Sequence, residues 1–244
     1  MIPFEEQLAA YRQQHFGFVD RLIYREKAEI LDLFPESELA AEVVRDLEAL
    51  ANASGLKRKL TDFILKNIRA QVAGSVSVIE VCGGSCWLLR SVTSQVDHGE
   101  FHIHAVGSDL SQRHIETNTT AFRHMNIEWL VADATNLLFS NLKFDIALNC
   151  QALHHFPAGI VIKLLRELKR ISKKVIIFDL RRTFYGPALV QSLSPFYSSS
   201  FISDGVASHR RAYSIQEMEF IIRIADLPYK VTPFTPVGML VESI

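Results

Sequence analysis

The chain has 244 residues, of which 48% are hydrophobic and 22% are charged, as in an ordinary globular protein with a sizeable core. Its formal net charge of −1 creates no strong field toward nucleic acid or an anionic membrane surface, so neither is an expected partner. Residues 1–6 lack the pattern of a signal peptide, no apolar run would span a bilayer, and three cysteines make no disulfide framework. We therefore expect a cytoplasmic protein without a membrane span.

Helices are predicted for roughly the first 72 residues. One begins at residues 35–38 and places apolar side chains on one face, at Leu39, Val43, Leu47 and Leu50. Residues 52–55 break it, and a second helix is indicated by Leu60, Phe63, Ile64 and Ile68. No glycine-rich or repetitive linker follows, so we expect residues 1–72 to form a helical cap on a main domain of residues 73–244.

A strand, a tight turn and a helix start are predicted next. The β-branched run 76–81 ends at Gly83 and Gly84, and an apolar segment of helical character follows. Glycines let a ligand approach the backbone, and the N–H groups at a helix start favour an anionic group. A nucleotide-like ligand above this turn is the first hypothesis.

Two acids indicate which ligand this would be. The dinucleotide fingerprint G-x-G-x-x-G is absent, Glu80 precedes the turn, and Asp109 ends the next predicted strand, residues 101–108. A carboxylate at the end of the second strand suits a ribose diol, and an acid beside the glycines suits an ammonium group rather than a pyrophosphate. S-adenosylmethionine carries both groups. A purely structural turn with solvated acids is the competing interpretation.

Strands and helices then alternate. Ser111 is expected to cap a helix that runs to about residue 123, and a strand follows at 127–131. The later elements are a strand at 144–149, a helix with apolar spacing over 161–171, and a strand at 175–178. This order predicts an α/β fold with a doubly wound, Rossmann-like sheet, which binds ligands beyond the carboxyl ends of its strands. The polar groups expected at that edge are Glu80, Asp109, Asp133, Asn149, His154, His155, Asp179 and Arg181.

The last sixty residues depart from this alternation. Residues 183–213 are rich in aromatic side chains and are predicted to form an inserted helical lid. Ser214 and Glu217 make a capping box for a further helix. Two strand candidates, 229–234 and 237–241, are joined by a short link, which predicts an antiparallel hairpin at the end of a seven-stranded sheet.

These motifs resemble those of class I S-adenosylmethionine-dependent methyltransferases. Residues 80–86 (Glu-Val-Cys-Gly-Gly-Ser-Cys) are similar to their first motif and residues 106–110 to their second, while Ala132-Asp133-Ala134 is similar to the third and 144–155 to the fourth. The match runs from about residue 76 to 180. The N-terminal helices, residues 179–182 and the segment 204–213 also resemble bacterial methyltransferases found beside type III polyketide synthases.

The resemblance implies roles for single residues. Glu80 would face the methionine amino group, directly or through water, Gly83 and Gly84 would admit the cofactor, and Asp109 would hold the ribose. The remaining cofactor residues would be Leu110, Asp133 and Ala134 at the adenine and ribose, and Asn149 near the transferred methyl. Cys82 and Cys86 stand where the family prefers glycine, and a positive φ at either would cost about 1 kcal/mol and narrow the cofactor slot.

Methyl transfer is an in-line displacement, and a phenol or carboxylate acceptor must lose its proton. His154 and His155 are the candidate catalytic bases, with a wall or positioning role as the alternative. An acidic or polyketide-like acceptor would be bound by charged and aromatic groups, for which the candidates are Arg181, Tyr185, His209, Arg210 and Arg211. Each of these has the alternative of an ordinary surface or lid residue.

The first functional hypothesis is O-methylation of a small aromatic or lipid-like acceptor of the polyketide type, in secondary metabolism. C-methylation of a similar acceptor and a degenerate, non-catalytic partner subunit remain open. An NAD-dependent oxidoreductase is disfavoured by the missing third glycine, and RNA methylation by the neutral charge. No metal site is predicted, since Cys82 and Cys86 have no companion pair at zinc spacing. The oligomeric state is open, with a homodimer among the alternatives.

Overall fold

The computed structural model describes residues 2–71, 74–96 and 102–244. Its strands form a seven-stranded sheet in the order β3-β2-β1-β4-β5-β7-β6. The described chain divides into two compact units, unit 1 with residues 1–46, 151–166 and 178–244, and unit 2 with residues 47–150 and 167–177. Each unit is described by itself below.

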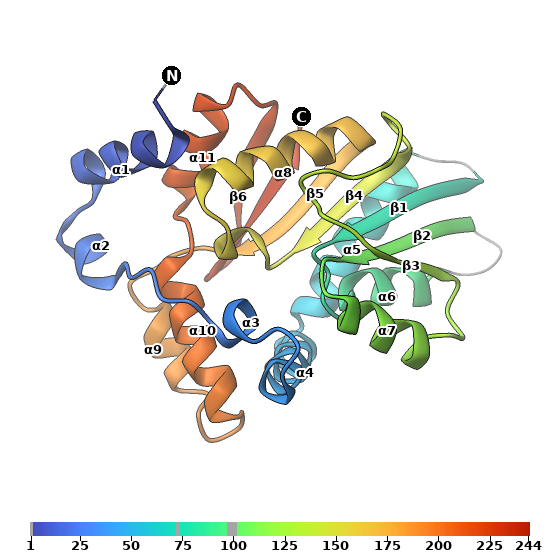
Figure 1. Ribbon diagram of the computed structural model, residues 1–244, viewed down its shortest axis with the longest axis horizontal. Coiled ribbons are helices and arrows are strands. Elements are labelled where there is room, and N and C mark those ends of the chain that lie inside the picture. Colours follow the sequence, from blue (N-terminus) through green and yellow to red (C-terminus); the bar gives the residue numbers. More distant parts are fainter. Residues whose placement is uncertain (1, 72–73, 97–101) are drawn as a thin grey trace. The chain divides into compact units, whose positions relative to one another are not determined.

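Unit 2 contains the parallel part of the sheet. Its central strand, β1, pairs in parallel with β2 on one side and with β4 on the other, and β2 pairs in parallel with β3 (Figure 1). The strands of this part are β1 (Ser75–Val81), β2 (His102–Asp109), β3 (Ile127–Val131) and β4 (Phe144–Cys150). Five of the seven residues of β1 and six of the seven of β4 are buried, as expected for strands covered on both faces.

Three helices lie wholly within unit 2, one before β1, one after β1 and one after β2. They are α5 (Leu56–Gln71), α6 (Trp87–Ser94) and α7 (Gln112–Ala121). α5 packs on α6, where the Thr61 hydroxyl donates to the Ser91 hydroxyl at 2.9 Å in a buried contact. Ser111 caps α7 by accepting the His114 N–H, as the sequence predicts. Three elements, α4 (Glu38–Ala53), α8 (Ala158–Ile171) and β5 (Ser172–Leu180), contribute residues to both units.

Unit 1 contains the antiparallel hairpin and most of the remaining helices. β6 (Tyr229–Thr235) pairs antiparallel with β7 (Gly238–Ser243), with a register shift between Pro233 and Thr235. The Tyr229 hydroxyl anchors this hairpin by donating to the Leu165 carbonyl of α8 at 2.8 Å. The other elements are α1 (Phe4–His15), α2 (Phe18–Ile23), α3 (Ile30–Leu33), the 3₁₀ turn η1 (Leu153–His155), α9 (Gly186–Gln191), α10 (Ser199–Arg211) and α11 (Ile215–Ile224).

The predicted fold class is confirmed. The sheet has seven strands with an antiparallel end, the N-terminal segment is helical, and the predicted lid segment 183–213 holds α9 and α10. The predicted strand start at Phe101 and the predicted domain boundary at residue 72 fall outside the described residues. No helix in the described ranges has the length and apolarity that crossing a bilayer requires.

The predicted capping box at α11 is confirmed, and it supplies a stability test. The Ser214 hydroxyl accepts the Glu217 N–H at 3.2 Å, and the Glu217 carboxylate accepts the Ser214 N–H at 2.7 Å. We expect Ser214→Ala to lower the free energy of unfolding by about 1 kcal/mol. The Glu217 N–H loses its acceptor, and the reciprocal bond from the Ser214 N–H to the Glu217 carboxylate loses its support. Urea denaturation measures this. The exposed Ser194→Ala is the control and should stay within about 0.5 kcal/mol, and an equal loss in both variants would contradict the prediction.

Candidate functional site

The turn after β1 has an unusual backbone. Cys82, Gly84 and Cys86 have φ angles of 49°, 52° and 47°, so three of five consecutive residues are in the left-handed region. The turn is closed by hydrogen bonds from the Cys86 N–H to the Gly83 carbonyl, 2.7 Å, and from the Gly83 N–H to the Ser108 carbonyl, 3.1 Å. Both cysteines therefore have a backbone conformation that favours glycine, and a side chain strains it.

The Cys86 thiol fills the space beneath the glycines. A Cβ added to Gly83 would lie 2.3 Å from Cys86 Sγ, and one added to Gly107 would lie 3.1 Å from it. Gly84 is different, because an added Cβ would meet nothing within 4 Å. The side of the turn at Gly84 is therefore open to a ligand, while the side at Gly83 is filled by the protein itself.

Asp109, at the end of β2, holds this turn. One carboxylate oxygen accepts the Gly84 N–H at 2.8 Å, and the other accepts the Ser111 N–H at 2.9 Å. Burial alone would raise the pKa of Asp109, but the contact with His114 and the two N–H donors outweigh it and lower the pKa. The group is thus an ionised acceptor at neutral pH, with lone pairs left for a diol.

Glu80 lies deeper than the sequence indicates. Its side chain is 1% exposed, and Oε2 accepts the Leu89 N–H in the first turn of α6 at 2.8 Å. Burial raises the pKa of Glu80 to about 7, against the opposing effects of the Leu89 N–H and Arg90. The carboxyl group therefore supports the helix start, and its contact with a cofactor amino group stays a prediction.

Asn149, in β4, presents an unsatisfied acceptor. Its Nδ2 donates to the Val81 carbonyl at 2.9 Å, which fixes the amide, while Oδ1 is buried and accepts no hydrogen bond. Such an atom costs free energy unless a ligand donates to it. An ammonium group would satisfy it, so the residues of this edge fit S-adenosylmethionine.

The predicted adenine-side residues lie on the loops after β2 and β3. Leu110 is 71% exposed directly after Asp109, and Ala134 is buried. Asp133 shapes its own turn, since Oδ1 accepts both the Thr135 N–H and the Thr135 hydroxyl at 2.8 Å. All the predicted cofactor residues thus belong to unit 2.

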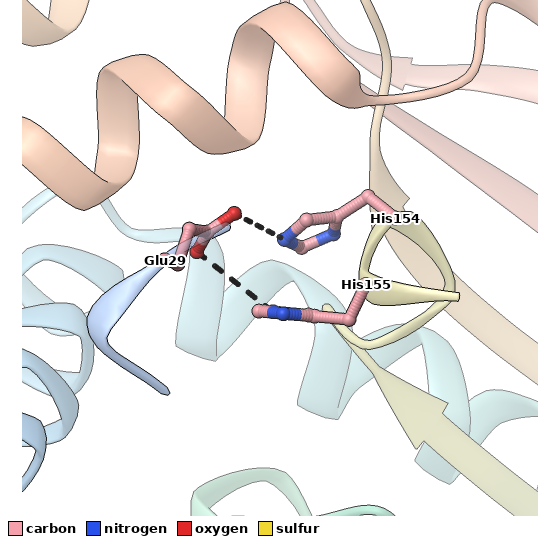
Figure 2. A group of neighbouring side chains, drawn as sticks. All are labelled: Glu29, His154 and His155. Carbon is pink, nitrogen blue, oxygen red and sulfur yellow. Dashed lines mark ion pairs between the residues drawn. The ribbon is translucent and has the colours of Figure 1, made fainter. Parts of the chain in front are cut away.

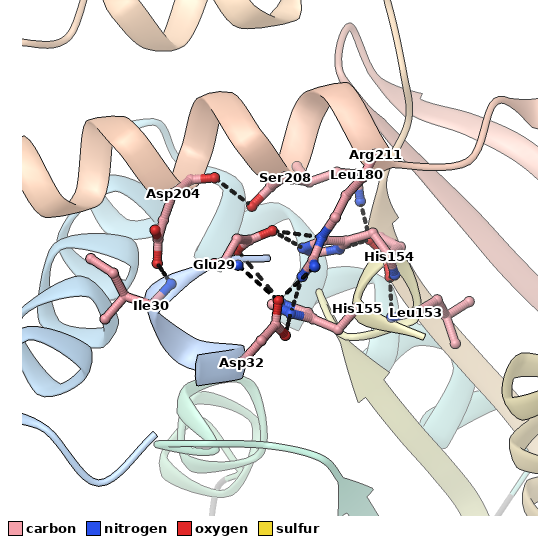
Figure 3. Close-up of polar contacts among 11 residues, drawn as sticks. Glu29, Ile30, Asp32, Leu153, His154, His155, Leu180, Asp204, Ser208 and Arg211 are labelled. Carbon is pink, nitrogen blue, oxygen red and sulfur yellow. Dashed lines mark hydrogen bonds and ion pairs between the residues drawn. The ribbon is translucent and has the colours of Figure 1, made fainter. Parts of the chain in front are cut away.

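Unit 1 carries a separate cluster around the two histidines. His154 Nδ1 lies 2.6 Å from Asp179 Oδ1. His155 Nδ1 lies 2.7 Å from Asp32 Oδ1 (Figure 3). Arg211 joins the cluster, with Nε 2.8 Å from Glu29 Oε1, a further contact to Asp32 and one to His155 Nδ1. Each imidazole is therefore oriented by a carboxylate, and only Arg211 of the predicted acceptor residues joins the histidines.

The other predicted acceptor residues lie elsewhere. Arg181 and Tyr185 both donate to the Pro236 carbonyl, at 2.8 Å from Arg181 Nη2 and 2.5 Å from the Tyr185 hydroxyl. His209 is buried against Gly186, and burial lowers its pKa to about 4. Arg210 lines a cavity of about 740 Å³ beside α10 that does not include the histidines.

A second cavity in unit 1 does include them. Its volume is about 530 Å³, and its wall combines aromatic, cationic and acidic side chains with the imidazoles, among them Arg12, Tyr24, Asp32, His154, His155, Phe156, Arg211 and Tyr213. Arg12 is held there by Glu217 at 2.6 Å and lies over the Tyr24 ring at 4.2 Å. This is a small, mixed pocket of the kind that binds a partly aromatic ligand with a polar group.

Sequence reasoning missed several members of this cluster. Glu29 and Asp32 come from the short segment around α3, and Arg12 comes from α1, none of which carries a motif. They are brought to the histidines by contacts that span more than a hundred residues. Asp179 was predicted at the same edge, because the sequence places it at the end of a strand.

Comparison with known proteins agrees with this geometry. Residues 78–174 match the family model described as a methyltransferase domain. No curated protein matches the sequence.

Solved structures share the fold. A SAM-dependent methyltransferase from Aquifex aeolicus superimposes with a TM-score of 0.55 at 16% identity, over 81% of this chain and 96% of that chain. The plantazolicin methyltransferase BpumL, solved with a monoazolic desmethylPZN analog and SAH, gives 0.64 at 13% identity over 98% and 96%. The plantazolicin methyltransferase BamL, solved with a triazolic analog and SAH, gives the same values. The fold is therefore that of the Rossmann-like methyltransferases.

Cofactor affinity should depend on Asp109. We expect Asp109→Ala to weaken S-adenosylhomocysteine binding at least about tenfold, because the ribose loses a charged acceptor and the Gly84 turn loses its support. Calorimetric titration measures this, with the exposed Glu128→Gln of β3 as the control in the same unit. Unchanged affinity in Asp109→Ala, or tight binding of NADH by the wild-type protein, would contradict this assignment.

The strained turn supplies a second test. We expect Cys82→Gly to raise the free energy of unfolding by up to about 1 kcal/mol, because glycine removes the penalty of a side chain at φ 49°. Cys150→Ala is the matched control, and it should lower stability because it leaves a space in a buried position of β4. Urea denaturation measures the free energy of unfolding of both variants. A loss of stability in Cys82→Gly would mean that the thiol contributes more by packing than the turn costs.

Proposed function

We propose that this chain, an S-adenosylmethionine-dependent methyltransferase, transfers a methyl group to an oxygen of a small aromatic or lipid-like acceptor of the polyketide type. The observation that carries the proposal is the cavity of about 530 Å³, whose wall contains both histidines. Tyr24, Phe156 and Tyr213 offer it apolar surface, while Arg12 and Arg211 offer charge to an acidic group. The resemblance to enzymes that occur beside type III polyketide synthases supports an acceptor of this class.

A small-molecule acceptor also has support from the fold comparison. The plantazolicin methyltransferases BpumL and BamL were solved with desmethylPZN analogs together with SAH. This likeness is one of fold, and the chemistry of the acceptor in our proposal comes from the cavity.

S-adenosylmethionine supplies an electrophilic methyl group on a sulfonium. The residues that would hold it are Asp109 at the ribose, the Gly84 backbone, and Asn149 with its unpartnered Oδ1 at the ammonium group. Their task is orientation, because an in-line displacement gains most of its rate from alignment of the reacting atoms and exclusion of water.

We assign the catalytic base to His154. Its Nδ1 faces Asp179 Oδ1 at 2.6 Å, and Asp179 is fully buried and fixed by the Leu153 N–H. A carboxylate accepts only, so Nδ1 carries the proton and Nε2 is free to take the proton of an acceptor hydroxyl. His155 shares its Nδ1 between Asp32 and Arg211, which suits positioning of the acceptor better than proton transfer.

The base assignment is tested with His154→Gln. We expect kcat to fall about 100-fold or more, while the affinity for S-adenosylhomocysteine stays unchanged, because the histidine acts on the acceptor and not on the cofactor. The rate is measured as S-adenosylhomocysteine release with a panel of phenols and polyketide-like acids, and His124→Gln, an exposed histidine of unit 2, is the control.

A pH profile separates a base from a merely structural histidine. The wild-type rate should reach a plateau as pH rises, because the base then accepts the proton, whereas the rate of His154→Gln should keep rising as the acceptor itself ionises. Identical profile shapes would overturn the base assignment. A product methylated at carbon would replace O-methylation by C-methylation, and cofactor binding without turnover on any acceptor would favour the non-catalytic partner subunit.

A further inference from the structure

Glu29, His154 and His155 turn three acceptor atoms toward one another. His154 Nε2 lies 4.0 Å from Glu29 Oε1, and His155 Nε2 lies 3.9 Å from Glu29 Oε2 (Figure 2). One ligand atom from each residue can be chosen so that all three lie within 4.8 Å of one another. We propose that these three side chains bind a divalent transition-metal ion.

The ring contacts of His154 suit this role. Asp179 accepts from the His154 Nδ1–H, so the lone pair of this imidazole lies on Nε2, the atom that faces Glu29. Histidines that bind metals in proteins almost always donate their other ring N–H to a carboxylate or carbonyl in this way. His155 Nδ1 lies beside both Asp32 and Arg211, and its Nε2 also faces Glu29.

The distances to Glu29 exclude ordinary hydrogen bonds. A charged N–H···O bond is about 2.7–2.9 Å long, a full ångström shorter than the separations seen. Glu29 is 2% exposed, and its Oε1 is buried without a hydrogen bond, although Arg211 Nε lies 2.8 Å away. The structure therefore holds a buried carboxylate and two imidazole nitrogens that face one another without a hydrogen bond between them, with Arg211 as the cation beside the carboxylate.

The charge of the cluster also favours a cation. Four carboxyl groups, those of Glu29, Asp32, Asp179 and Asp204, surround the histidines, and Arg211 is the guanidinium that contacts two of them. Asp204 accepts the Ile30 N–H beside Glu29. A divalent ion would offset most of the remaining negative charge.

The donor set points to the class of metal. Two imidazoles and one carboxylate favour zinc, cobalt, iron or manganese over magnesium and calcium, which prefer oxygen ligands. Around a tetrahedral ion with bonds of about 2.0–2.1 Å, ligand atoms lie about 3.3 Å apart. The three ligand atoms already lie within 4.8 Å of one another, so small side-chain rotations would bring them to this spacing. Both histidines also line the cavity, so an open coordination position would face it.

The metal site deepens the proposed function. What the ion would do rests on that function, but whether an ion binds does not. An ion bound there would stabilise the oxyanion of an acidic acceptor whose proton has passed to solvent, so in the metal-bound protein His154 would be a ligand and the ion would take over the role of the base. Metal binding itself is measured without acceptor or cofactor. If no ion binds, His154 remains the assigned base. If an ion binds but no acceptor is methylated, the metal site stands and the proposed function does not.

The experiment uses Co²⁺ as the probe on the full chain, freed of any affinity tag and treated with a chelator. We expect one equivalent of Co²⁺ to bind and to give visible d–d absorption with nitrogen ligation, and Zn²⁺ to displace it. Mg²⁺ should not compete. Calorimetry gives the stoichiometry and the dissociation constant for the wild-type protein, and absence of one-to-one binding there would by itself overturn the proposal.

The variants locate the site. We expect His155→Gln, at the least buried ligand, to weaken Co²⁺ binding about 100-fold or more, and Glu29→Gln to do the same. Asp179→Asn keeps all three ligands but weakens the support of His154, so the loss should be about 10–100-fold. His124→Gln should bind as the wild type does, and near-ultraviolet circular dichroism reports whether each variant is folded. Equal Co²⁺ binding by the wild type and by folded His155→Gln would overturn the assignment to these residues, and loss in His124→Gln alone would place the ion at the surface.

Discussion

The carboxylate of Asp109 joins the turn after β1 to the start of α7. Its two oxygens accept N–H groups from two different loops, Gly84 after β1 and Ser111 before α7. Because each bond is made to an ionised group, the pair is worth more than two neutral hydrogen bonds. The open face of the Gly84 turn and the start of α7 are thus fixed by one side chain, which also has the lone pairs that a ribose diol requires. In our proposal the same carboxylate would therefore serve both the stability of the turn and the binding of the cofactor.

The predicted cofactor residues and the two histidines belong to different compact units. Glu80, Asp109 and Asn149 lie in unit 2, and the cavity that His154 and His155 line lies in unit 1. His154 follows Cys150, the last residue of β4, by only four positions. In our proposal the donor side consists largely of backbone turns and the acceptor side of loop and helix side chains, and the second kind of site changes more easily while the fold is kept.

Much of the fold and of the cofactor edge could be predicted from the sequence. Apolar strands, the Ser111 cap and the Ser214 capping box are local signals, and the hydrogen bonds of each cap join residues only three apart. The acceptor side could not, because Glu29 and Asp32 reach the histidines from a segment without periodicity. The burial of Glu80 was also missed, since a sequence shows an acid at a strand end but not that the N–H of Leu89 will close over it.

The two thiols of the glycine turn are unreactive at neutral pH. Burial raises the pKa of Cys82 and of Cys86, so neither thiol is a reactive thiolate at neutral pH. Cys86 is also sealed beneath Gly83 and Gly107, and a reagent reaches it only when the turn opens. The rate at which an alkylating agent modifies Cys86 therefore measures how often this turn opens by local unfolding, and the measurement needs no engineered label.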